Sequence, residues 1–261
     1  MESTLAIPKS ELETEVAIFL GYSTVSANRS ASQNSRIASY VKQGLAQFYR
    51  PDPMGPGESS YEWSFLRPTV SLALESGAQT VALPDDFGGL DGDIVVLQSS
   101  GIHQPIRVVG EGYLRKCYSQ SPDQTGSPIA AAMSWRKGTT GQRSQRCDLL
   151  IFPEADAAYT LQFKYTILPD ALTDDRPYAY GGAAHADTIR ASCIAAAELG
   201  QDEVIGVRHE NFLRRLAMSI SIDRKFKPVV HGYNGDDSDG AWMRGDGRVG
   251  YPAATYDGTA Y

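Results

Sequence analysis

The sequence predicts an α+β fold: a helical bundle formed by N- and C-terminal helices, an inserted antiparallel β-rich subdomain of the sandwich or barrel type, and an extended C-terminal arm. Three observations predict it. Apolar residues recur at helical spacing near both ends of the chain. The middle of the chain instead shows short β-rich runs separated by Gly, Pro and Asp clusters. Neither pattern continues beyond Phe226. The expected limits are 1–60 for the N-terminal helices, 61–168 for the insertion, 169–226 for the C-terminal helical hairpin and 227–261 for the arm.

Two helices are expected at the N-terminus. Ser10 and Glu13 have the S-x-x-E spacing of a capping box, and Gly21 can end the helix that follows. The second helix is expected from about Ser32 to Tyr49, because Pro51 cannot continue it. Its apolar face contains Ile37, Val41, Leu45 and Phe48.

A helical hairpin is expected from about Ala184 to Phe226, with a break near Gly200–Asp202. The apolar stripe of its first helix contains Ile189, Cys193, Ala196 and Ala197. That of its second contains Val204, Ile205, Phe212, Leu213, Leu216 and Ile220. The alanines leave room for another helix to approach closely. Two helices cannot bury both stripes alone, so we expect the N-terminal helices to pack against them.

The insertion begins with three aromatic residues in five positions. We interpret Tyr61, Trp63, Phe65 and Leu66 as core residues at the junction of the two subdomains, because aromatic side chains bury large apolar areas. The strands that follow are separated by turn residues, which favours an antiparallel sheet. The segment EGYLRKCY is expected to form a single helical turn between strands.

Composition narrows the function classes. The net charge is −7, with 24 Lys and Arg against 31 Asp and Glu, so affinity for nucleic acid is not expected. An acidic surface can still line a passage through which DNA slides, because like charge repels phosphate. Three widely spaced cysteines do not predict a disulfide framework and indicate a reducing compartment. We expect neither a signal peptide nor a membrane span.

Catalytic patterns are weak. The four histidines are far apart; His185 is interpreted as a helix cap or surface group and His209 as part of a solvated face. Adjacent aspartates lie beside turn residues, where they support turns. The stretch NGDDSDG fails as a calcium loop, because Gly235 occupies the first ligand position and Asp246 the twelfth. We therefore predict no enzyme activity, no metal site and no cofactor.

The expected arm, 227–261, is rich in Gly, Asp and Tyr and has no helical face. Five aromatic residues are spaced along it: Tyr233, Trp242, Tyr251, Tyr256 and Tyr261. One interpretation is an arm that folds on a partner, with these residues filling pockets. The other is a loosely ordered segment that packs on its own domain.

The order of several segments is similar to that of a known family. These segments are Tyr61–Leu66, Leu83–Gly89, Gly126–Pro128, Leu149–Asp156, Tyr159–Thr166 and Gly181–Asp187 with Ala197-Glu198. Over about 32–226 the chain resembles head-to-tail adaptor (connector) proteins of tailed bacteriophages. The resemblance implies a helical bundle with a β-rich insertion. It also implies a virion protein of the neck that is made in the host cytoplasm.

The resemblance further implies the partners. They are the portal protein, a downstream neck or tail protein, and further copies of the chain in a closed ring of twelve. DNA would pass through the lumen without specific binding during packaging and ejection, and the arm would dock into the portal. We expect no membrane partner.

Two other classes stay open from the sequence. One is a different ring protein of the same machine: a stopper, a tail-tube terminator or a tail tubular protein. The other is a hydrolase or a carbohydrate-binding β module with helical flanks. Contact with the portal would favour the adaptor, and a pocket with a perturbed histidine beside a serine or aspartate would favour the hydrolase.

Overall fold

The structure, a computed structural model, describes residues 3–53, 59–97, 103–137, 145–226, 255–256 and 259–260. These residues form an α+β fold with five α-helices and a mostly antiparallel sheet, so the predicted α+β class is confirmed. The chain divides into two compact units. One combines Met1–Arg67 with Leu168–Pro228, and the other contains Pro68–Ile167.

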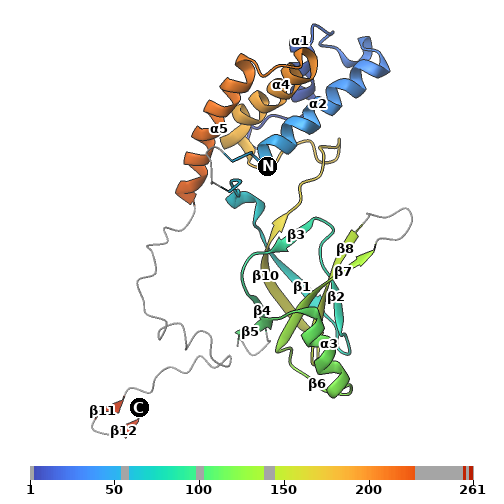
Figure 1. The fold of residues 1–261 in the computed structure, drawn as a ribbon, viewed down its shortest axis with the longest axis vertical. Helices are drawn as coiled ribbons and strands as arrows, with labels where there is room; N and C mark the ends of the chain where they lie inside the picture. The colour runs from blue at the N-terminus through green and yellow to red at the C-terminus, as the bar shows by residue number, and fades with distance from the viewer. Residues whose placement is uncertain are drawn as a thin grey trace. The chain divides into compact units, whose positions relative to one another are not determined.

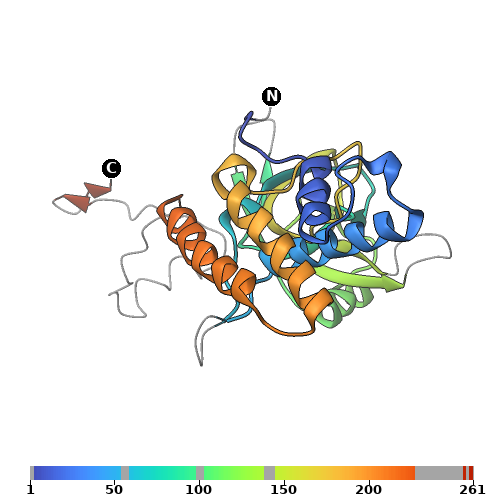
Figure 2. The ribbon, with the colours of Figure 1, turned by 90° about the horizontal axis from the view of Figure 1, so that it is seen from above.

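The first unit is helical and takes its helices from both ends of the chain. Its α-helices are α1 (Lys9–Phe19), α2 (Ala31–Tyr49), α4 (Ala186–Asp202) and α5 (Val207–Phe226). Short 3₁₀ turns occur at Ser26–Asn28, Ser64–Leu66 and Gly182–His185. Helix α4 contacts α1, α2 and α5, and α1 also contacts α2 (Figures 1 and 2). Helices from the two ends of the chain therefore pack against each other.

The core of this unit is formed by the apolar faces of the four helices. The buried side chains include Leu12, Val16, Ile37, Val41, Leu45, Phe48, Ile189, Cys193, Phe212, Leu216 and Ile220. They recur every three or four residues on each helix, which is the spacing that brings side chains to one face. Burial of such faces is the main favourable term in the folding of a helical unit.

Helices α2 and α4 approach so closely that a side chain at Gly44 would not fit. A Cβ atom added there would lie 2.5 Å from the Cα atom of Cys193. The Ser192 hydroxyl donates a hydrogen bond of 2.7 Å to the carbonyl oxygen of Gly44. Towards the C-terminal end of α4, Gly200 lies against the ring of Tyr40 in the same way. Small residues therefore fix the distance between the two helices.

The prediction that Ser10 caps the first helix is wrong. Helix α1 begins at Lys9, Pro8 occupies the cap position, and no side chain caps the helix. The Pro8 carbonyl accepts hydrogen bonds from the backbone N–H groups of Glu11 and Leu12, so the first turn is closed by the backbone. The capping box lies instead at α2, where the side chains of Ser30 and Gln33 bond reciprocally to backbone N–H groups.

Two residues of the predicted α5 stripe are not on that helix. Val204 and Ile205 are each 64% exposed and lie in the connection between α4 and α5. The backbone of Glu203 adopts a positive φ of 56°, which ends α4, and α5 begins only at Val207. Leu213 does lie on α5, but it is 41% exposed and not part of the core. The helical period therefore does not extend across the break.

The second unit is built on an eight-stranded, mostly antiparallel and nearly closed barrel-like sheet with the order β1-β10-β4-β5-β7-β8-β2 (Figure 1). Its strands are β1 (Thr69–Leu74), β2 (Thr80–Ala82), β3 (Phe87–Leu90), β4 (Ile94–Leu97), β5 (His103–Val108), β7 (Ala130–Lys137), β8 (Gln145–Phe152) and β10 (Tyr159–Ile167). Strand β3 pairs with β10, outside this order. Along β10, Leu161, Phe163, Tyr165 and Ile167 are buried. This alternation is typical of a strand with one face in a core.

A helix of ten residues, α3 (Glu111–Gln120), lies where a single turn was expected, so that prediction is wrong. Strands β5 and β7 pair in parallel, with Arg107 opposite Ala130. A parallel pair needs a crossover connection, and α3 supplies it. Leu114 of α3 is buried against Ala132 and Phe152 of the sheet. Topology therefore required a longer helix than the local sequence suggested.

Three shorter pairs complete the described structure. Strands β6 (Thr125–Gly126) and β9 (Glu154–Ala155) pair in parallel. Strands β11 (Thr255–Tyr256) and β12 (Thr259–Ala260) pair antiparallel. An isolated antiparallel bridge links Pro8 to Tyr178.

The close approach of α2 and α4 predicts a steric effect. Gly44→Ala should reduce the free energy of unfolding by about 1–3 kcal/mol, the usual range for overpacking a core. Urea denaturation followed by circular dichroism would measure it. The matched control is Gly112→Ala in α3, where an added Cβ has no neighbour within 4 Å. That variant should be neutral or up to about 1 kcal/mol more stable, since Ala favours helix. Equal effects at the two positions would contradict the steric argument.

Candidate assembly surfaces

The segment Tyr61–Leu66 packs into the core of the helical unit. Trp63 is 1% exposed, and its indole N–H donates a hydrogen bond of 2.9 Å to the carbonyl oxygen of Phe48. Its ring centroid lies 4.8 Å from that of Phe48 and 5.2 Å from that of Phe65. Leu66 is buried, and Tyr61 and Phe65 are partly buried against the same core. Their role as a junction between the two subdomains stays a prediction.

His185 occupies the N-cap position of α4, but its side chain makes no cap hydrogen bond and is buried in this aromatic cluster, so its assignment as a surface group is wrong. It is 4% exposed, and its ring centroid lies 5.3 Å from those of Trp63 and Phe65. The 3₁₀ turn Gly182–His185 lies directly before α4 and directs the imidazole of His185 into the core. Nδ1 has no hydrogen-bond partner within the described residues. Burial lowers the pKa of His185, against an opposing effect of the Asp223 carboxylate.

Asp223 joins the last turns of α5 to the Tyr61–Leu66 segment. Its carboxylate is buried and accepts hydrogen bonds from the Tyr61 hydroxyl at 2.8 Å, the Ser64 backbone N–H at 3.1 Å and the Ser64 hydroxyl at 2.5 Å. Burial, and then the bond to Asp223, raise the pKa of Tyr61 to about 12. No sequence motif singled out Asp223 as a functional or structural residue. The available signal was a carboxylate three residues after Ile220, on the buried face of the helix.

The turn between α4 and α5 is held by Glu198. Its carboxylate accepts hydrogen bonds from the backbone N–H groups of Arg208 at 3.2 Å and His209 at 3.1 Å, in the first turn of α5. A carboxylate at this position stabilises a helix N-terminus. Val204 and Ile205 project from this turn, and Val207 at the start of α5 is 75% exposed. Such a group of exposed apolar side chains on a fixed turn is typical of an interaction surface.

A groove lies beside α1 and α2. It consists of two hollows of about 370 and 250 Å³, which share Ala171 and Leu172. Val41, Leu45 and Leu172 contribute apolar side chains to the larger hollow. The charged residues that line the two hollows are Lys9, Glu13, Lys42, Asp170, Asp175 and Arg176. The groove therefore combines an apolar floor with a charged rim.

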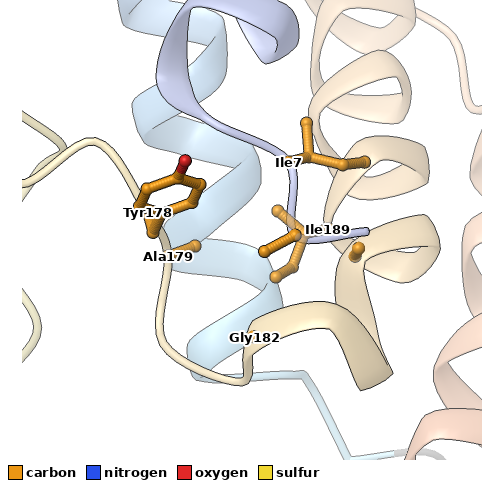
Figure 3. Close-up of a pocket in the computed structure, with 7 residues that line it drawn as sticks. Ile7, Tyr178, Ala179, Gly182 and Ile189 are labelled. Atoms are coloured by element: carbon orange, nitrogen blue, oxygen red, sulfur yellow. The ribbon is translucent and has the colours of Figure 1, made fainter. Parts of the chain in front are cut away.

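A further pocket is too small to hold a ligand. It is lined by residues that include Ile7, Tyr178, Ala179, Gly182 and Ile189 (Figure 3). Its volume is about 10 Å³, which is close to the minimum for a single water molecule. This pocket lies between the segment before α1, the approach to α4, and α4 itself. We interpret it as a packing defect.

The described residues show neither a metal-ligand cluster nor a membrane-spanning helix. No group of three His, Cys, Asp or Glu side chains among them could hold a metal ion. None of the helices described here is both long and apolar enough to cross a bilayer. The three cysteines are free thiols, and Cys147 and Cys193 are buried.

Four of the five predicted arm aromatics lie outside the described residues: Tyr233, Trp242, Tyr251 and Tyr261. Tyr256 belongs to β11, of which the structure describes the backbone. The arm therefore stays a prediction.

The chain matches a known protein family over a range that includes both units. The family model of the SU10 adaptor protein matches residues 8–227. The chain belongs to the SU10 adaptor family. The predicted resemblance to phage head-to-tail adaptors is therefore confirmed, and the chain is a structural adaptor of the virion. No curated protein matches this adaptor.

Asp223 of the adaptor should be important for stability. Asp223→Ala leaves the Tyr61 hydroxyl and both Ser64 donors without their acceptor, so we expect a loss of about 1–3 kcal/mol in the free energy of unfolding. Chemical denaturation would measure the loss. The exposed Asp175→Ala is the control and should change stability by about 0.5 kcal/mol or less. An equally small effect at Asp223 would contradict the assigned role.

The burial of His185 predicts a pH dependence. Because its pKa is lowered in the folded adaptor below the ordinary value of 6.5, the unfolded chain takes up this proton first as the pH falls. This contribution therefore reduces stability as the pH falls below about 6.5. His185→Phe should remove it, by up to about 1.4 kcal/mol for each unit of pKa separation. Urea unfolding at pH 8, 6 and 5 would measure the effect, and parallel pH profiles for the two proteins would rule it out.

Proposed function

We propose that this adaptor forms a closed ring of twelve copies beneath the portal of the packaged head. The ring prolongs the DNA channel and presents a docking platform for the next neck or tail protein. The observation that carries the proposal is the family match across 8–227, which spans the helical unit and the inserted sheet. The ring geometry itself is argued from symmetry, because one heterologous interface repeated around an axis closes into a ring.

In this proposal α1, α2, α4 and α5 form the helical bundle that the sequence predicts. The contacts of α4 with the other three helices support it. The chain would then be organised as predicted, with helices at 1–60 and 169–226, the insertion at 61–168 and the arm at 227–261. Tyr61, Trp63, Phe65 and Leu66 would form the junction core.

The charge of the chain suits a protein through which DNA passes. A net charge of −7 disfavours adhesion of phosphate to the lumen wall, so DNA can move through in packaging and in ejection. The adaptor would assemble in the host cytoplasm and remain at the head-to-tail interface of the virion.

The arm is proposed to dock into the portal through its aromatic residues: Tyr233, Trp242, Tyr251, Tyr256 and Tyr261. Aromatic residues separated by polar spacers are typical of segments that order on a partner. Such ordering would couple attachment to assembly, and a chain that is monomeric in free solution could then form rings only on the portal.

Electron microscopy of the adaptor mixed with the portal protein of the same phage tests the proposal. We expect closed rings bound directly to the portal. Rings that bind tail proteins but not the portal would favour a stopper, a tail-tube terminator or a tail tubular protein instead. Absence of rings with any of these proteins would overturn the proposal.

The arm gives a separate prediction. A chain that ends at Phe226 should keep its thermal unfolding transition, because the cores of both units lie before that residue. Its binding to portals should weaken, which pull-down and particle counts by electron microscopy would measure. A full-length chain with Tyr233, Trp242 and Tyr251 replaced by Ser is the matched variant and should weaken binding too. Normal decoration of portals by both variants would refute the role of the arm.

A further inference from the structure

The second half of α5 has an exposed basic face. The helix packs on α4 and lies at the edge of the helical unit (Figures 1 and 2). Arg214, Arg224 and Lys225 are exposed on it. Over 213–225 the sequence contains one acidic residue, Asp223, and its side chain is buried. This part of the helix therefore presents positive charge to solvent, and we call its three exposed cations the basic face of α5.

A pocket opens beside the basic face. It has a volume of about 300 Å³ and lies between the last turns of α5 and the chain that follows α2. Ala217 and Ile220 line it, and the ring centroid of Tyr61, another lining residue, lies 5.8 Å from the guanidinium carbon of Arg224. Asp52 also lines the pocket, so one carboxylate stands against the three cations of the face. The volume is at the lower end of the range for ligand pockets, about 300–1,000 Å³, and suits a single aromatic side chain.

The chain that follows α5 has the opposite charge. Residues 228–243 lie outside the described residues, and their sequence contains three Asp and no Glu, Lys or Arg. The three carboxylates are Asp236, Asp237 and Asp239, and Tyr233 precedes them and Trp242 follows them. An acidic segment bordered by aromatic residues is complementary to a basic face with a pocket beside it.

The connection between the two is long enough for contact within one chain. Residues 227–236 span about 33 Å when extended. The helix from Arg214 to Phe226 is about 18 Å long, at 1.5 Å per residue. The acidic segment can therefore turn back along the whole basic face. A short tether also keeps it at an effective concentration of about a millimolar, so individually weak ion pairs are enough to populate the contact.

We propose that residues 233–242 dock on the basic face of α5 in the same chain. Tyr233 enters the pocket beside Tyr61, and the aspartates lie beside Arg214 and Lys225. The occupant is this segment because it has the complementary charge, has an aromatic residue for the pocket, and follows directly from the end of the same helix.

The contact has a consequence for assembly, which rests on the proposed function. There Tyr233 and Trp242 dock into the portal, and one side chain cannot occupy both sites. The free chain would then hold this part of the arm on α5, and the portal would have to displace it. Such competition lowers the apparent affinity for the portal in proportion to the docked fraction.

A disulfide between two introduced cysteines measures the contact in the full chain without the portal. In a Cys117→Ser background, Ser221→Cys at an exposed position of α5 is combined with Asn234→Cys next to Tyr233. The fraction of disulfide in a glutathione redox buffer gives the effective concentration of one cysteine at the other. We expect a disulfide within the monomer, because the docked segment keeps the two cysteines together.

Charge reversal tests the pairing in this background. Arg214→Glu with Lys225→Glu should lower the effective concentration about fivefold or more, because like charges then face each other. Asp236→Lys with Asp237→Lys should lower it in the same way. A chain with all four changes should regain the wild-type value, which a simple loss of folding would not do.

The control is Arg107→Glu with Lys116→Glu in the sheet unit, which changes the net charge by the same amount at exposed positions and should have no effect. Tyr233→Ser should lower the effective concentration, and Tyr261→Ser should not. Equal values in all variants would show random encounters of the arm with α5 and would overturn the proposal. Disulfide-linked dimers in place of monomers would place the segment on another copy and would overturn it too.

Portal binding separates this inference from the proposed function. The chain locked by the disulfide should not decorate portals, and reduction should restore decoration. Normal decoration by the locked chain would contradict the competition between the two contacts. If the wild type and the reduced chain both fail to bind portals, the proposed function fails, while the disulfide measurement still decides the contact on α5.

Discussion

The close contact between α2 and α4 is the constraint on which the helical unit depends. The Gly44 position has no room for a Cβ atom against the backbone of Cys193, so these two helices can pack only with small residues between them. Because α4 also contacts α1 and α5, it sets the position of both N-terminal helices and of the last helix. The two ends of the chain are thereby held in one core.

The aromatic cluster around Trp63 connects this core to the last helix. Trp63 packs against Phe48 of α2, and Ser64 in the following turn donates to the Asp223 carboxylate of α5. His185, at the start of α4, completes the cluster and leaves one ring nitrogen without a partner among the described residues. A buried polar group without a hydrogen-bond partner is costly, and a buried charge costs more. The stability of this cluster therefore depends on whether His185 is protonated.

Much of the fold was predictable from the sequence, because apolar periodicity reports burial directly. Ile37, Val41, Leu45 and Phe48 follow the helical period and are all buried in α2. The change to short alternating runs likewise predicted the strands of the insertion. Helix ends were less predictable. Ser10 had the right spacing for a cap, but α1 begins at Lys9, whose backbone N–H donates a hydrogen bond to the Pro177 carbonyl, a distant contact that no local pattern encodes. The length of α3 was missed because it follows from the parallel pairing of β5 and β7, which is a property of the whole sheet.

The candidate surfaces were less accessible to sequence reasoning. Val207 and Leu172 are ordinary apolar residues in sequence, and only their exposure and position in the structure make them candidates for contact. The surface assignment of His185 was wrong because a histidine side chain at a helix start can point towards solvent or into the core. The 3₁₀ turn before α4 determines this orientation, and no sequence pattern reports it. The prediction placed Val204 and Ile205 on a buried stripe, although both are exposed. The residue with a left-handed backbone that ends α4 is Glu203, whereas such an end is usually marked by a glycine.

The pairing of Thr69 with Lys164 in neighbouring strands places the first and last strands of the insertion side by side. The two ends of the insertion therefore lie close together. Connecting them to the helical unit costs little loop-closure entropy. The sheet can therefore be exchanged, enlarged or trimmed over evolutionary time while the surrounding helices keep their packing.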